Sequence, residues 1–186
     1  MTISPQFREQ IISAIPGLRA FGMSLAARSD RADDLVQETL MKAWKHHDSF
    51  QPDTNMKAWL YTILRNEFYT QLRKRKREVE DADGVYSSKV EVPAEQNGHL
   101  DMADLRIALA KLPEDQREAI ILVGASGFSY EEAAEICSVA VGTVKSRVNR
   151  ARARLTLLLQ SGDPKKTSHD AVSNSILMNL EQESKD

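Results

Sequence analysis

The sequence predicts an all-α protein made of two small helical domains. Glycine and proline account for only 8 and 6 of the 186 residues, and charged residues reach 28%, a composition typical of helical proteins. Apolar residues recur at helical spacing on both sides of a polar middle segment, and no stretch alternates convincingly as a strand would. We expect helical domains over residues 5–77 and 101–160, a linker over 78–100 and a C-terminal tail over 161–186. The tail is either flexible or forms one short amphipathic helix.

The middle segment is acidic, whereas both domains end in cationic runs. Residues 78–104 hold eight acidic residues and one lysine, with few large apolar side chains, which favours a flexible linker. Five consecutive cations, Arg73 to Arg77, close the first domain, and five more fall within residues 139–160 without an acid among them. Two basic regions on either side of an acidic tether predict two contacts with a polyanion, although charge alone fits solvated helix surfaces equally well.

The second domain has the pattern of a helix-turn-helix. Ser129 followed by Glu132 matches a capping box at the start of a short helix, and a tight turn at residues 137–139 follows. In the next helix, from about residue 140 to 159, one narrow apolar arc holds Val144, Val148, Ala151, Leu155 and Leu158. The rest of this helix is suited to reading the major groove. Its candidate DNA contacts are Thr143, Lys145, Ser146, Arg147, Asn149, Arg150 and Arg154.

The first domain contains a helix with a polar row opposite its buried arc. This helix is expected to begin near Arg31, with Ser29 and Asp30 as its caps. The row consists of Asp34, Gln37, Glu38, Met41 and Lys45. An exposed row that contains a methionine suits protein docking, but on the pattern alone an ordinary solvated face is the more common explanation.

The helix that begins at Met56 is predicted to bury one side and to present groups for unpaired DNA on the other. Cations follow the phosphates of a single strand, and aromatic rings stack on its bases. The candidates are Arg65, Asn66, Tyr69, Arg73 and Lys74. Trp44 and Trp59 are expected to be core residues rather than DNA contacts.

Four sequence runs point to one family. They are Asp33-Asp-Leu-Val-Gln-Glu-Thr39, Leu112-Pro-Glu-Asp-Gln-Arg-Glu118, Ser129-Tyr-Glu-Glu-Ala-Ala-Glu-Ile136 and Val141-Gly-Thr-Val-Lys-Ser-Arg-Val148. They resemble regions two and four of the extracytoplasmic-function (ECF) RNA polymerase sigma factors, and the whole pattern is most similar to the alphaproteobacterial general-stress-response branch. The resemblance covers about residues 7–77 and 101–158.

The resemblance implies a role for each domain. The first would bind core RNA polymerase and recognise and melt the -10 promoter element, with Asp34, Gln37 and Glu38 gripping the clamp helices of the largest subunit. The loop before Met56 would capture a flipped base, for which Phe50 and Asp53 are candidates, although Phe50 is equally well explained as core packing. The second domain would bind the -35 element and the polymerase flap. An anti-sigma factor would occlude both domains.

Other functions fit less well. A sigma-like decoy that binds an anti-sigma factor has no need of intact cationic clusters, and a plain helix-turn-helix regulator would leave the Asp34 row without a role. An enzyme is disfavoured, because the four histidines lack metal-ligand spacing and no phosphate-binding glycine loop stands out. We therefore expect no catalytic residue, cofactor or metal. The single cysteine, Cys137, and the lack of an apolar leader or spanning segment predict a cytoplasmic protein.

Overall fold

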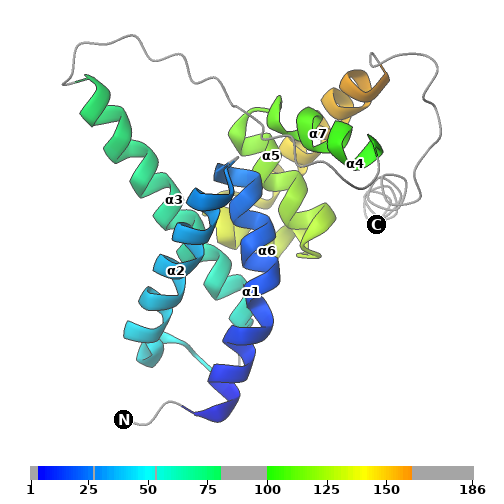
Figure 1. The fold of residues 1–186 in the computed structure, drawn as a ribbon. Coiled ribbons are helices and arrows are strands. Elements are labelled where there is room, and N and C mark those ends of the chain that lie inside the picture. The colour runs from blue at the N-terminus through cyan, green and yellow to red at the C-terminus, as the bar shows by residue number, and fades with distance from the viewer. Residues whose placement is uncertain (1–3, 27, 53, 81–99, 161–186) are drawn as a thin grey trace. The chain divides into compact units, whose positions relative to one another are not determined.

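The computed structural model describes residues 4–26, 28–52, 54–80 and 100–160, without the side chains of 78–80 and 100–103. The chain divides into two compact units, residues 1–91 and 92–186, and each is described by itself. Within the described residues every regular element is helical, which confirms the predicted all-α class (Figure 1). No helix among them is long and apolar enough to cross a lipid bilayer.

The first unit is a bundle of three helices. Helix α1 spans Pro5–Ala26, α2 spans Ser29–Lys45, and α3 spans Met56–Glu80, with a short 3-10 turn at His47–Ser49 after α2. The largest fully buried side chains of this unit come from all three helices and are Leu18, Phe21, Leu35, Leu60, Tyr61 and Leu64. The rings of Phe21 and Tyr61 stack with centroids 4.9 Å apart, which locks α1 onto α3.

Two glycines let α1 approach its neighbours closely. A Cβ atom at Gly17 would lie 2.7 Å from the Tyr61 hydroxyl oxygen, and one at Gly22 would lie 3.4 Å from the carbonyl oxygen of Ala32. The buried hydroxyl of Thr39 donates to the Leu35 carbonyl at 2.7 Å, so this polar side chain is satisfied inside the bundle. Gly17 therefore lets α1 lie close to Tyr61 of α3, and Gly22 lets it lie close to α2 at Ala32.

Two details of α2 were predicted wrongly. The helix begins at Ser29 after Arg28, and no side chain caps it. The Asp30 carboxylate instead accepts from the Arg28 guanidinium at 2.6 Å, and Asp30 lies inside the first turn rather than at the cap position. Trp44 is 43% exposed rather than buried, because Ala43 takes the adjacent core position and Trp44 extends the outward row of Gln37 and Met41.

The second unit packs three helices around α7. Its elements are α4 (Leu100–Ala110), α5 (Glu114–Ile120), a π-helical turn (Ile121–Ala125), α6 (Tyr130–Cys137) and α7 (Val141–Gln160). The predicted capping box is present: the Ser129 hydroxyl accepts from the Glu132 backbone N–H at 3.1 Å, and the Glu132 carboxylate accepts from the Ser129 N–H at 2.9 Å. Ser138, with φ at 54°, ends α6 in the left-handed conformation, which makes the turn into α7.

The apolar arc predicted for α7 faces the interior of this unit. Val144, Val148, Ala151 and Leu155 are buried, and Leu158 is half-buried near the end of the helix. Burial of this single stripe fixes which side of α7 remains available to a ligand. The predicted linker, 78–100, lies almost wholly outside the described residues, except that α3 continues to Glu80 and α4 begins at Leu100. The tail, 161–186, lies outside them as well.

Candidate nucleic-acid interface

Helix α7 presents a polar and cationic surface opposite its buried stripe. Among the predicted contacts, Lys145, Ser146, Asn149, Arg150 and Arg154 are exposed, and Thr143 and Arg147 are half-buried. The Arg150 guanidinium donates to the Ser146 carbonyl at 3.2 Å, which orients this long side chain along the helix. This helix follows a short helix and a tight turn, the arrangement that places side chains on base edges in a major groove.

Arg147 differs from the exposed cations Lys145, Arg150 and Arg154 of α7. Its Nε atom lies 3.2 Å from a carboxylate oxygen of Asp115 on α5, and its side chain is only 18% exposed. An ion pair in this partly covered position ties the middle of α7 to α5. Arg147 therefore has a packing role that Arg150 does not share.

The candidate contacts on α3 lie on its outer side. Asn66, Arg73 and Lys74 are exposed, whereas Arg65 and Tyr69 are half-buried. The Arg65 guanidinium lies over the Tyr69 ring, 4.8 Å from its centroid. An exposed amide, two exposed cations and an aromatic ring already stacked on a cation are the groups that a single strand requires.

Phe50 belongs to an aromatic cluster. Its ring centroid lies 5.3 Å from that of Trp59 and 5.9 Å from that of Phe7 on α1, and the His47 ring centroid lies 6.3 Å from that of Phe7. Phe50 is half-buried, so it helps to hold the loop after α2 against α1 and α3. The other loop candidate, Asp53, lies outside the described residues.

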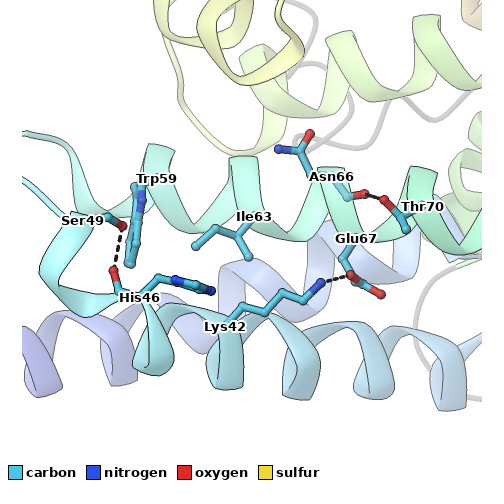
Figure 2. A pocket seen from close by; sticks show the side chains of 8 residues that line it. All are labelled: Lys42, His46, Ser49, Trp59, Ile63, Asn66, Glu67 and Thr70. Carbon is cyan, nitrogen blue, oxygen red and sulfur yellow. Dashed lines mark hydrogen bonds and ion pairs between the residues drawn. The ribbon is translucent and has the colours of Figure 1, made fainter.

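Beside this cluster, a groove of 290 Å³ runs between the end of α2 and the middle of α3 (Figure 2). Its walls are formed by Lys42, His46, Ser49, Trp59, Ile63, Asn66, Glu67 and Thr70. Figure 2 shows Lys42 reaching from α2 toward Glu67 on α3, with Ile63 between this pair and Trp59. The Asn66 amide projects from α3 on the side away from α2. Of these groove residues, only Asn66 is among the DNA contacts that the sequence predicts.

Glu67 is a buried acid at the rim of the bundle core. The residue is 8% exposed, and its two carboxylate oxygens accept separate hydrogen bonds, one from the Lys42 ammonium and one from the Gln71 amide at 2.9 Å. Burial raises the pKa of this carboxyl, but the bonds from Lys42 and Gln71 outweigh burial, and the pKa lies below its ordinary value of 4.5. Glu67 is therefore ionised at neutral pH and paired with Lys42.

The signal that would have revealed Glu67 is its position on the helix. It lies three residues after Leu64 and seven after Leu60, both fully buried, so the helical period places an acid on the buried arc. A buried acid requires a partner, and a cation on the adjacent helix is the natural one. The sequence does not say which cation this is, because the pairing depends on how α2 and α3 pack.

The polar row on α2 is exposed as expected. Asp34, Gln37 and Met41 are exposed, Met41 to 62%, and Glu38 is half-buried. Together with Trp44 they form a surface that mixes acids with large apolar side chains, which we call the α2 row. Such a mixture suits protein docking better than solvation alone. No group of three or more potential metal ligands occurs among the residues that the structure describes.

Comparison with known proteins assigns each unit to a protein family. The family model for sigma-70 region 2 matches residues 12–78, and that for sigma-70 region 4 matches residues 103–155. The chain is 59% identical over 159 residues to the ECF RNA polymerase sigma factor EcfG of Rhodopseudomonas palustris, covering 86% of this chain and 88% of that protein. This chain belongs to the ECF family of RNA polymerase sigma factors. As an ECF sigma factor it binds core RNA polymerase, recognises promoter DNA and initiates transcription.

Solved structures agree with this assignment. The ECF sigma factor is similar to the sigma factor RpoE of Bartonella quintana, solved in complex with the anti-sigma factor NepR, at 56% identity and a TM-score of 0.78. The match covers 86% of this chain and all of that one (100%). These likenesses confirm the predicted family, the two-domain helical fold and the resemblance to the general-stress-response branch.

A second structural likeness bears on the decoy alternative. The complex of the anti-anti-sigma factor PhyR with NepR, also from Bartonella quintana, matches at a TM-score of 0.54 and 17% identity, over 81% of this chain and 49% of that one. At that identity the match shows the fold alone. The high identity over both domains is with sigma factors, which favours the sigma factor over the decoy.

Proposed function

We propose that this ECF sigma factor holds promoter DNA at two surfaces. Helix α7 lies in the major groove of the -35 element, with Lys145, Asn149 and Arg150 toward the DNA. The observation that carries this proposal is that α7 buries one apolar stripe and leaves Lys145, Arg150 and Arg154 exposed, in a chain whose region 4 matches the sigma-70 family. Arginine pairs with guanine and asparagine with adenine in that groove.

The unpaired -10 strand is proposed to follow the outer side of α3. Arg73 and Lys74 contact its phosphates, Tyr69 stacks on a base, and the groove beside Asn66 receives an extruded base. Support comes from the exposure of these cations and from the groove between α2 and α3. Extruding a base costs a few kcal/mol, so a preformed groove that returns part of this energy favours melting. In this proposal Phe50 supports the groove through Trp59 and does not itself bind the base.

The α2 row is the proposed contact with the clamp helices of the polymerase. Asp34, Gln37 and Glu38 supply its charge and hydrogen bonds, and Met41 and Trp44 supply its apolar area. Polymerase docking then fixes the distance between the two DNA-binding units. The spacing between the promoter elements thereby becomes part of what is recognised.

Control by an anti-sigma factor completes the proposal. The similar RpoE protein was solved bound to NepR, and we propose that a protein of that kind sequesters this sigma factor in the cytoplasm until stress releases it. The sigma factor itself catalyses no reaction and needs no cofactor, since the chemistry belongs to the polymerase.

Two sets of variants test whether polymerase binding and -35 binding use different surfaces. Asp34→Lys with Glu38→Lys should abolish retention of core polymerase in a pull-down and leave binding to promoter duplex unchanged. Arg150→Ala should weaken binding to the -35 duplex and leave the pull-down unchanged. If each variant impairs both assays equally, or if the reversed charges leave core binding intact, the assignment of the two surfaces is wrong.

A further inference from the structure

The pair formed by Lys42 and Glu67 gives the groove an electrostatic character unlike that of the exposed cations Arg73 and Lys74 farther along α3. Glu67 is almost fully buried, whereas the Lys42 side chain is 43% exposed and extends into the groove. Glu38 also faces Lys42, but its carboxylate oxygen lies 3.8 Å from the ammonium, beyond hydrogen-bond distance. Glu67 is therefore the principal counter-charge of this lysine.

A phosphate cannot easily take Lys42 away from Glu67. Doing so would leave an unpaired carboxylate in a covered position, which is far more costly than breaking an exposed ion pair. A phosphate entering the groove would also approach the Glu67 carboxylate, and the two negative charges would repel each other. The lysine thus contributes hydrogen-bond donors to the groove without contributing a free positive charge.

A base edge matches this arrangement better than a phosphate does. Bases are neutral and carry donors and acceptors side by side, whereas a phosphate carries acceptors only. The ammonium has three N–H donors, of which Glu67 occupies one, and the carboxylate oxygens retain lone pairs. The groove therefore offers donors and acceptors next to each other, with no net charge from the pair.

We propose that Glu67 is a positioning residue that holds the Lys42 ammonium away from phosphate, so that the groove accepts a neutral base of the unpaired strand rather than its backbone. This inference rests on the proposed function, in which the -10 strand follows α3. Arg73, two turns after Asn66, provides the contrast: it is exposed and makes no ion pair within the described residues, so its charge is available to phosphate.

The salt dependence of DNA binding tests this inference. The full chain is titrated into a fluorescein-labelled single-stranded DNA of mixed sequence, by anisotropy, at several salt concentrations. Glu67→Gln should release Lys42 to a phosphate and steepen the slope of log affinity against log salt by ~0.7, the contribution of one neutralised phosphate on a single strand. Lys42→Gln in the Glu67→Gln background should return the slope to the wild-type value.

Two controls separate this effect from general charge and from misfolding. Asp33→Asn makes the same change in net charge at an exposed acid paired with Arg19, and it should leave the slope unchanged. If Glu67→Gln does not fold, the double variant Lys42→Gln, Glu67→Gln decides, because it leaves no unpaired carboxylate in the groove. It should leave the slope unchanged, whereas Arg73→Gln should lower the slope by ~0.7.

The results distinguish the role of Glu67 from the assignment of the -10 strand to α3. The role of Glu67 is overturned if Glu67→Gln has the same slope as Asp33→Asn. It is also overturned if the Lys42→Gln, Glu67→Gln double variant lowers the slope as much as Arg73→Gln does. In both cases the -10 assignment still stands. If the wild-type chain does not bind single-stranded DNA, the -10 assignment on α3 fails, and the role of Glu67 fails with it.

Discussion

Individual side chains differ in how well the sequence predicts their roles. The exposure of Lys145, Asn149 and Arg150 follows from the helical period once the apolar stripe of α7 is recognised. The pairing of Arg147 with Asp115 and of Lys42 with Glu67 does not follow, because each joins two helices. A pattern within one helix says which side is buried but not which residue of another helix lies against it.

Glu67 should make the stability of the first unit depend on pH. Because the pKa of Glu67 is lowered in the folded chain, its stabilising contribution is complete above the ordinary glutamate pKa of 4.5 and is lost as the pH falls through the lowered value. The difference in unfolding free energy between wild type and Glu67→Gln should therefore be constant at neutral pH and shrink below about pH 4.5. Urea unfolding followed by tryptophan fluorescence measures it, since Trp44 and Trp59 both lie in this unit. A difference that does not change with pH would contradict the assignment.

The capping box of α6 provides a matched pair of variants. Glu131 and Glu132 both lie in the first turn of α6, but only Glu132 accepts a hydrogen bond from the Ser129 backbone N–H. Glu132→Ala should destabilise the second unit by about 1 kcal/mol more than Glu131→Ala does. Far-UV circular dichroism during urea unfolding measures this loss. Equal effects of the two substitutions would mean that the box contributes nothing beyond the charge at the helix start.

For the secondary-structure elements, the sequence predicts the positions of the helices well but the residues at which they begin and end less well. The apolar periods located α2, α3, α6 and α7, because burial of one face dominates helix stability. The start of α2 was predicted wrongly, since Asp30 pairs with Arg28 instead of capping the helix. The π-helical end of α5 was also not predicted: the Ser126 N–H donates to the Ile121 carbonyl at 2.8 Å, a backbone adjustment without a distinct sequence signal.

Helix α7 should separate DNA contact from packing. Arg150→Ala should weaken binding to a -35 duplex by about 1–3 kcal/mol if it pairs with a guanine, and leave the stability of the second unit unchanged. Arg147→Ala should lower both the affinity for the -35 duplex and the stability of the second unit, because this side chain also holds α5 through Asp115. Fluorescence anisotropy gives the affinity and circular dichroism gives the stability. An Arg150→Ala variant that unfolds as easily as Arg147→Ala would contradict the distinction.

At the scale of the whole molecule, the sequence predicted two helical units and the family to which they belong. The break in polarity near the middle of the chain separates them, and family models for regions 2 and 4 match one unit each. The exact boundaries remain predictions. In the proposed function, the polymerase sets the distance between the units, so recognition of promoter spacing should require it.

The units should also unfold independently, since each has its own core. Glu132→Ala should shift the circular dichroism transition of the second unit and leave the tryptophan transition of the first unit in place. Urea unfolding of one sample with both probes makes the comparison. A coincident shift of both transitions would show that the units are coupled.

The most direct measurement is transcription in vitro with purified cognate core polymerase on genomic DNA fragments, with and without this chain, followed by sequencing of the transcript 5′ ends. Defined start sites should appear only when the chain is added, and the Asp34→Lys, Glu38→Lys variant should remove them. Identical start profiles with and without the chain would contradict its role as a sigma factor.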